Sequence, residues 1–153
     1  MNKMQLMGKL EQAWEAFKQS WAGLADDQMQ EPGVVGDWSV KDILAHVTVW
    51  EEEALKYLPL IRQCGTPPRY ADMYGGIDTF NAQMTERNRG LPLDEVLLHL
   101  EETHQQLVSY LEGTPEEMIR TETRFRKRLR LDTYSHYPEH TRAILEWRAR
   151  MQS

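Results

Sequence analysis

The stretch Ser39-Val40-Lys41-Asp42-Ile43-Leu44-Ala45-His46-Val47 begins a long apolar series. Ser39 is a good helix N-cap, and Asp42, three residues later, completes a shortened capping box. Apolar residues then recur at spacings of three and four: Val40, Ile43, Leu44, Val47, Trp50, Ala54, Tyr57 and Leu58. This spacing predicts an amphipathic helix to about Gln63, in which Pro59 kinks or shortens the last turn.

Three further apolar series predict the other helical segments. The first covers residues 6–24 and ends before Pro32-Gly33, which cannot continue a helix comfortably. The second, from Ile77 to Gly113, is interrupted by a glycine and a proline, so it is either one bent helix or two helices in series. The last covers Asp132 to Met151. The sequence therefore predicts an all-α fold of four main helices with two long connections.

Residues 120–131 depart from the helical pattern. Apolar Phe125, Leu129 and Leu131 alternate there with arginines. A period of two predicts an extended or irregular segment. The basic run Arg124–Arg130 is interpreted either as a solvated connection or as an anion-binding rim for an acidic thiol cofactor or substrate, because arginine binds carboxylates with two parallel hydrogen bonds.

Length and composition limit the class of protein. With 153 residues, 41% of them hydrophobic, the chain is expected to form a single domain over residues 1–153. The net charge of −6 argues against nucleic acid as a partner. The single cysteine, Cys64, excludes an intramolecular disulfide and a cysteine-rich metal cluster. The first ten residues lack a signal-peptide core and no stretch approaches a membrane span, so we expect a cytoplasmic protein and no membrane partner.

Three histidines form a candidate metal site. His136 and His140 are four residues apart, which places both on one face of a helix, and His46 belongs to the core-facing stripe of an earlier helix. Three imidazoles can hold a cation and leave a coordination position open. The alternative is that they are ordinary hydrogen-bonded histidines. His104 is interpreted as a satisfied, partly buried histidine, and His99 as a solvated one.

Pro138 lies between the two histidines of the last segment. Inside a helix it would remove a backbone hydrogen bond. If Thr133 or Ser135 is the N-cap, however, Pro138 falls in or just after the first turn, where its missing N–H costs little. Asp132 and Glu139 are then candidates to orient an imidazole.

Two motifs in this order resemble a known family. Trp38-Ser39-Val40-Lys41-Asp42-Ile43-Leu44-Ala45-His46 resembles the W-S-x-K-D-(I/V)-L-A-H signature of the DinB/YfiT-like superfamily, and Asp132–His140 resembles its last-helix motif. Within the superfamily the chain is most similar to the ClbS/DfsB-like branch. The resemblance implies an antiparallel four-helix bundle with a long crossover connection, a homodimer, and a divalent metal, nickel or zinc, on residues matching His46, His136 and His140.

The resemblance also implies two kinds of function. Characterised relatives include enzymes that use a low-molecular-weight thiol, so one hypothesis is a metal-dependent thiol S-transferase or hydrolase acting on an electrophilic small-molecule substrate. The alternative is a non-catalytic self-resistance protein of the ClbS/DfsB type that sequesters or detoxifies a reactive small molecule. A third hypothesis is a structural bundle. Trp50, Glu53, Tyr134 and Tyr137 are candidate pocket residues by helical spacing, but the sequence identifies no catalytic residue.

Overall fold

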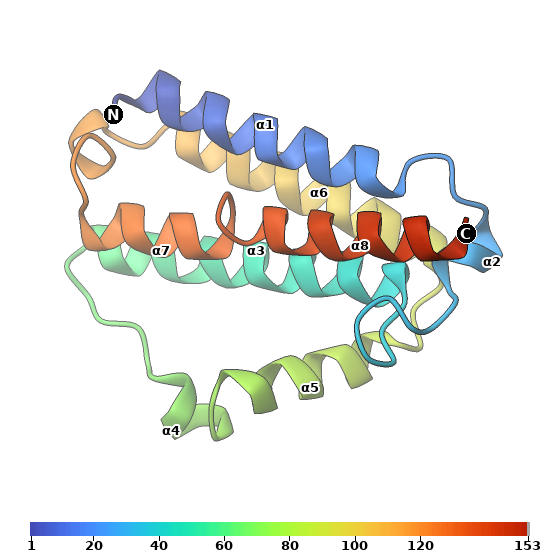
Figure 1. The fold of residues 1–153 in the computed structure, drawn as a ribbon. Helices are drawn as coiled ribbons and strands as arrows, with labels where there is room; N and C mark the ends of the chain where they lie inside the picture. Colours follow the sequence, from blue (N-terminus) through green and yellow to red (C-terminus); the bar gives the residue numbers. More distant parts are fainter. Residues whose placement is uncertain (153) are drawn as a thin grey trace.

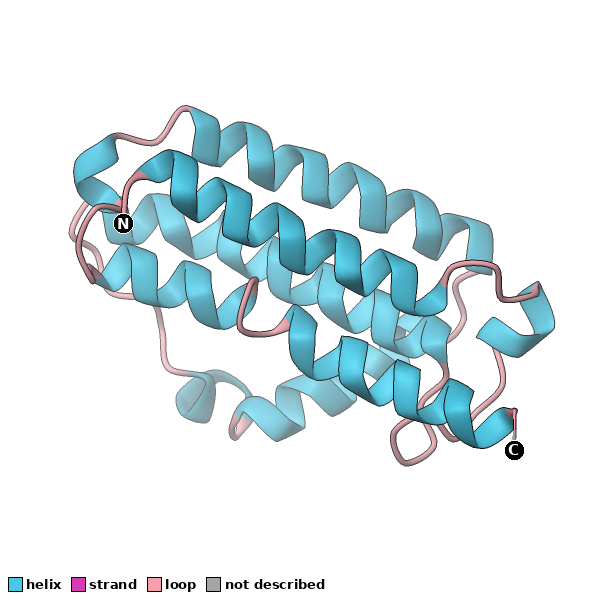
Figure 2. Cartoon of the chain, turned by 45° about the horizontal axis from the view of Figure 1, so that its top comes forward, coloured by secondary structure: helices cyan, strands magenta, loops and turns pink. Residues whose placement is uncertain are grey.

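Helices make up nearly all the regular structure of residues 1–152, the part of the chain that this computed structural model describes (Figures 1 and 2). In chain order they are α1 (Lys3–Trp21), α2 (Asp26–Met29), α3 (Val40–Arg62), α4 (Tyr70–Tyr74), α5 (Ile77–Asn88), α6 (Leu93–Glu112), a 3₁₀ turn (Glu116–Met118), α7 (Arg124–Asp132) and α8 (Tyr137–Met151). Within these 152 residues, no helix combines the length and the apolar character that crossing a membrane requires.

The main body is a four-helix bundle in which α7 and α8, placed end to end, together form the fourth member (Figure 1). α3 packs against α6 and α7, and α1 packs against α8. α3 and α6 run in the same direction, opposite to α1 and to α7–α8, so the chain must return along the bundle between them (Figure 1). This return contains α4 and α5. The predicted all-α bundle with a long crossover is confirmed.

The long central helix α3 begins where the sequence predicts. Ser39 Oγ accepts a hydrogen bond from the Asp42 N–H at 3.1 Å, and the Ser39 N–H donates to Asp42 Oδ2 at 3.0 Å. Its apolar stripe enters the main core, whose other large members come from α1, α6, α7 and α8: Leu6, Trp14, Phe17, Leu100, Leu107, Phe125 and Tyr137. Pro59 is accommodated inside the helix, which ends at Arg62.

The series from Ile77 to Gly113 forms two separate helices. α5 lies in the crossover against the outer side of α3, and only α6 is a member of the bundle. α5 closes a small second core made of Val49, Trp50 and Phe80, to which Tyr70 and Tyr74 of α4 add their rings. This second core determines how the crossover covers one side of α3.

The prediction of an extended or irregular segment over residues 120–131 is correct for residues 120–123, which are irregular, and wrong from Arg124 on, because α7 is helical from Arg124 to Asp132. Thr123 caps this helix by accepting a hydrogen bond from the Arg126 N–H at 3.0 Å. Phe125 and Leu129, four residues apart, are buried on one face, whereas Leu131, which completed the alternating pattern, is 53% exposed. The buried residues follow a helical period that the alternation with arginines concealed.

The capping box at the start of α3 yields a prediction about stability. Ser39→Ala removes the side-chain acceptor for an otherwise unpaired N–H and should lower the free energy of unfolding by about 1 kcal/mol. Ser109→Ala, on the exposed surface of α6, is the matched control and should change it by less than about 0.5 kcal/mol. Urea unfolding measures both. Equal effects of the two substitutions would show that the cap contributes little.

Candidate metal centre

The three histidines come from two parts of the bundle. His46 lies in the second turn of α3, His136 is the residue immediately before α8, and His140 lies in the first turn of α8. Pro138 occupies the second position of α8, where a missing N–H removes no hydrogen bond from the helix. The proline therefore helps to start the helix between the two histidines.

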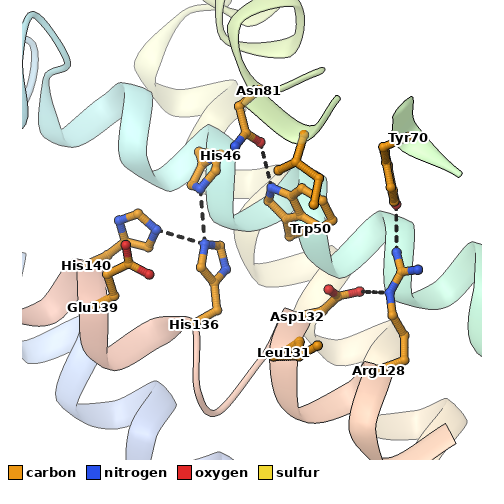
Figure 3. A pocket seen from close by; sticks show the side chains of 11 residues that line it. His46, Trp50, Tyr70, Asn81, Arg128, Leu131, Asp132, His136, Glu139 and His140 are labelled. Atoms are coloured by element: carbon orange, nitrogen blue, oxygen red, sulfur yellow. Dashed lines mark hydrogen bonds and ion pairs between the residues drawn. The ribbon is translucent and has the colours of Figure 1, made fainter. Parts of the chain in front are cut away.

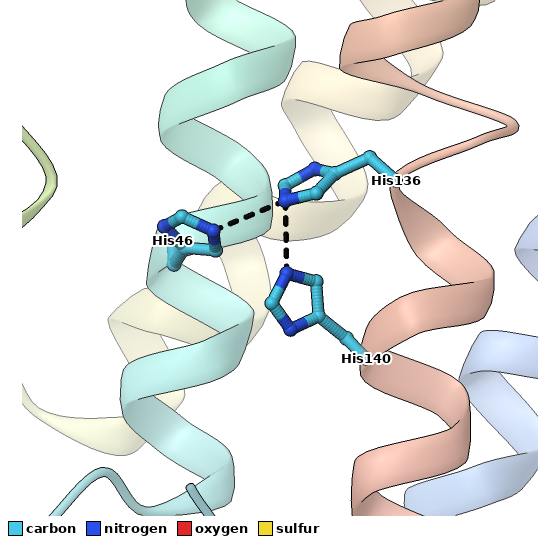
Figure 4. Close-up of side chains that lie close together, drawn as sticks. All are labelled: His46, His136 and His140. Carbon is cyan, nitrogen blue, oxygen red and sulfur yellow. Dashed lines mark hydrogen bonds between the residues drawn. The ribbon is translucent and has the colours of Figure 1, made fainter. Parts of the chain in front are cut away.

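The rings of these histidines point toward one another (Figure 4). The Nε2 atom of His136 lies 3.0 Å from Nε2 of His46 and 2.8 Å from Nε2 of His140. A ring nitrogen has either one proton to donate or one lone pair to accept with, so His136 Nε2 cannot make two good hydrogen bonds to its neighbours at once. Mutual hydrogen bonding therefore does not explain the arrangement fully.

Burial keeps these imidazoles neutral. It is the main reason why the pKa of His46 falls to about 2, of His136 to about 4 and of His140 to about 3. The neighbouring imidazoles lower the pKa of His46 and His140 further, because two positive charges so close together repel each other. At neutral pH each ring therefore keeps a lone pair that can bind a cation.

The donor set fits a borderline divalent ion. One nitrogen from each of the three histidines lies within 4.8 Å of the other two, and ligands about 2.0–2.1 Å from a single ion lie about 3.0–3.4 Å apart. Three neutral nitrogens suit zinc, nickel or copper, whereas calcium and magnesium prefer oxygen ligands. Among residues 1–152, this is the one cluster of three or more histidine, cysteine or acidic side chains with such spacing.

A cavity of about 410 Å³ opens beside the cluster. All three histidines line it, together with Trp50 of α3, Tyr70 of α4, and Arg128 and Asp132 of α7 (Figure 3). An ion held by the histidines would therefore face a space large enough for a small molecule.

The candidate pocket residues predicted from helical spacing are only partly confirmed. Trp50 lines the cavity, and Glu53 reaches its wall through a hydrogen bond from the Tyr70 hydroxyl at 2.9 Å. Tyr134 and Tyr137 do not line it: Tyr137 is fully buried in the main core. Its ring leaves α8 toward the bundle interior, a direction that spacing from His136 does not reveal.

Several cavity residues were missed because they belong to the crossover and to α7. Tyr70 and Asn81 reach the cavity only after the chain folds back along α3, and Arg128 was not singled out from its basic run. Asp132 was expected to orient an imidazole, but its carboxylate pairs with Arg128, with Nε and Oδ2 at 2.6 Å. The crossover carries no sequence motif that would have indicated this wall.

His104 belongs to a separate buried network. Its Nδ1 lies 3.1 Å from Glu51 Oε2, its Nε2 lies 3.1 Å from Glu11 Oε1, and its ring stacks on Trp14 with centroids 3.7 Å apart. Burial alone would lower the pKa of His104, but the two carboxylates outweigh it and raise it. His104 is therefore a satisfied core histidine as predicted, and His99 is exposed as predicted.

These features define an all-helical bundle in which a buried histidine cluster opens onto a cavity. The sequence matches the DinB superfamily over residues 9–145. The chain belongs to this superfamily. No curated protein sequence matches it.

Solved structures with the same fold include two from the expected branch. The colibactin self-resistance protein ClbS, in a complex with double-stranded DNA, superposes with a TM-score of 0.80 at 16% identity, covering 95% of this chain and 94% of ClbS. DfsB, described as a sibling lethal factor precursor, has a TM-score of 0.80 at 12% identity, covering 100% and 98%. A protein from Streptococcus pneumoniae has a TM-score of 0.80 at 16% identity, covering 97% and 91%.

The ClbS complex corrects one prediction. The expectation that nucleic acid is an unlikely partner is wrong, because a protein of this fold is solved with double-stranded DNA bound. The expectation rested on the net charge of the whole chain, which averages over unlike surfaces. Residues 120–130 alone carry six basic side chains and one acidic side chain, so the charge that faces a partner depends on the surface presented.

The low pKa values of the three histidines predict how the metal-free protein responds to acid. In the unfolded chain an imidazole has a pKa of about 6.5, well above the folded values of about 2, 4 and 3. At a pH between the folded and the unfolded pKa values, the unfolded state binds more protons than the folded state. The free energy of unfolding should therefore decrease as the pH falls below about 6.5, by up to about 1.4 kcal/mol per pH unit for each imidazole.

Urea unfolding after EDTA treatment, at about pH 7.5 and about pH 5, measures this dependence. His140→Gln removes one of the titrating groups and should weaken the dependence relative to the wild type. His99→Gln, an exposed histidine on α6, should leave it unchanged. The same dependence in His140→Gln and in the wild type would show that these rings are not held neutral by the fold.

Proposed function

We propose that this protein binds a divalent metal, nickel or zinc, through His46, His136 and His140, and acts on an electrophilic small molecule in the adjoining cavity. The observation that supports this most is the convergence of three neutral Nε2 atoms at the cavity wall. Such an ion stabilises the deprotonated form of a thiol or water that it binds, which makes that group a nucleophile near neutral pH. A thiol S-transferase or a hydrolase fits this chemistry.

The residues of the chain supply binding and orientation. The three imidazoles would hold the ion, and their burial keeps the nitrogens free of the protons that would compete with it. Trp50 and Tyr70 form an aromatic wall against which a substrate can lie. We assign no proton-transfer step to a side chain. The homodimer, the cytoplasmic location and the single-domain organisation stay predictions.

A second candidate is a non-catalytic protein that sequesters or detoxifies a reactive small molecule. The similarity of the fold to ClbS, described as a self-resistance protein, favours keeping this alternative. Both candidates use the same cavity. They differ in whether the bound compound is released chemically changed.

The metal site predicts a measurable stoichiometry. Protein purified without a metal-affinity column should contain about one nickel or zinc ion per chain by elemental analysis. His46→Ala, His136→Ala and His140→Ala each remove one of three ligands and should weaken metal binding by at least about 100-fold, more than the loss of a residue that only orients a ligand. His99→Ala is the matched control and should retain the metal.

Circular dichroism separates a lost ligand from a lost fold in these variants. The proposal requires helical content to be retained while the metal is lost. Wild-type protein that binds neither nickel nor zinc after dialysis against either ion would refute it.

Turnover distinguishes the two candidates. Incubation of metal-loaded protein with an excess of 2-mercaptoethanol and 1-chloro-2,4-dinitrobenzene should release chloride and give many thioether molecules per chain by mass spectrometry, and the His140→Ala variant should give only the uncatalysed amount. Formation of no more thioether than without protein, together with one tightly bound electrophile per chain, would favour sequestration over catalysis.

A further inference from the structure

One wall of the cavity consists of polar side chains that already bond to one another. Arg128 Nε donates to Asp132 Oδ2 at 2.6 Å, and Arg128 Nη2 donates to the Tyr70 hydroxyl at 2.7 Å. The same hydroxyl donates to Glu53 Oε1 at 2.9 Å. Tyr70 thus both accepts and donates within the wall. Figure 3 shows the contacts of Arg128 with Tyr70 and with Asp132, whose carboxylate matches the guanidinium charge.

This pairing makes Arg128 a poor binding group for an anion. The side chains of Arg128 and Asp132 are only 15% and 5% exposed. A ligand carboxylate that displaced Asp132 from the guanidinium of Arg128 would leave Asp132 without its partner in a weakly solvated place, which is costly. Glu139 adds another acidic side chain to the lining. The pairing therefore argues against Arg128, the arginine that reaches the cavity, as part of an anion-binding rim.

Apart from the three neutral histidines and Asn81, the remaining lining is apolar or aromatic. The Trp50 indole N–H donates to Asn81 Oδ1 at 2.8 Å, so its one polar atom is satisfied. Ile77 and Leu131 line the same cavity although they come from the start of α5 and the end of α7, and they are 52% and 53% exposed. Large apolar side chains that stay half exposed around a cavity are typical of ligand-contact surfaces.

From this wall we infer that the cavity selects an uncharged aromatic small molecule over an anionic one, with the ring of the ligand against Trp50, Ile77 and Leu131. The inference deepens the proposed function, on which it rests, by naming the substrate class of the same site. The selectivity arises from the pairing of Arg128 with Asp132 and from the apolar lining. This selectivity is opposite in direction to the effect of a bound cation, which would attract an anionic ligand.

The test compares two probes of nearly equal size, 2-naphthalenemethanol and 2-naphthoate, by equilibrium dialysis read through naphthalene fluorescence. The protein is used both as purified and after EDTA treatment, because a bound ion would attract the carboxylate. After EDTA treatment, 2-naphthalenemethanol should bind at least about tenfold more tightly. Equal affinities, or tighter binding of 2-naphthoate, would overturn the inference.

Two exposed leucines provide a matched pair of variants. Leu131→Ala should weaken binding of 2-naphthalenemethanol by about threefold or more, because it removes apolar contact area. Leu145→Ala, on α8 outside the cavity lining and 52% exposed in the structure, should have no effect. Equal effects of the two substitutions would place the probe elsewhere and contradict the inference.

A third variant tests the role of the ion pair. Asp132→Asn releases Arg128 from its carboxylate and should raise the affinity for 2-naphthoate, while Asp94→Asn makes the same change of net charge at the exposed start of α6 and should not. An unchanged affinity in folded Asp132→Asn would overturn the ion-pair argument. If Asp132→Asn does not fold, the leucine pair still decides.

Metal content, measured on the same samples, separates this inference from the proposed function. A protein that binds no metal but still prefers 2-naphthalenemethanol refutes the metal proposal and supports the selectivity. A protein that binds metal but shows no preference between the two probes supports the metal proposal and refutes the selectivity.

Discussion

The convergence of three neutral imidazoles between α3 and α8 is the constraint on which the site depends. Burial removes the protons that would make the rings repel each other, and it leaves the lone pairs directed at a common point. Such convergence needs a fixed register between the two helices. Packing of α1 against α8 and of α3 against α7 provides it, and the buried Tyr137 ring, next to His136, anchors the start of α8 against Trp14 and Phe17.

One face of α3 lines the cavity, and another face contributes to a buried polar contact in the core. His46 and Trp50 line the cavity, whereas Glu51, one residue further, is fully buried and meets His104 of α6. Burial raises the pKa of Glu51, and the hydrogen bond with His104 opposes that shift. A buried carboxylate is tolerated here because a partner satisfies it. One helix can therefore support a ligand cavity on one face and a polar cross-link in the core on another.

Charge is distributed unevenly along the chain, and this has consequences for partners. The net charge is −6, yet α7 carries five basic side chains and one acidic side chain. Acidic side chains of the same chain already pair with three of these arginines: Glu122 pairs with Arg126 and Arg130, and Asp132 pairs with Arg128. The effect of a charged side chain on a ligand thus depends on its partners in the fold, which is why neither the global charge nor the local count of arginines described the cavity.

The family motifs grouped His46 with His136 and His140, and only the structure showed that His136, rather than Thr133 or Ser135, is the N-cap of α8. The sequence by itself also determined the helical class, the start of α3 at Ser39 and the four-residue spacing of His136 and His140. These features follow from local rules, because capping and helical periodicity act over three or four residues. The helical period of α7 was present in Phe125 and Leu129 but was concealed by the arginines. The tertiary structure alone decided that Tyr137 points into the core, and that Tyr70, Ile77 and Asn81 complete the cavity. Those outcomes depend on which distant surfaces must be buried together, and no local pattern encodes that choice.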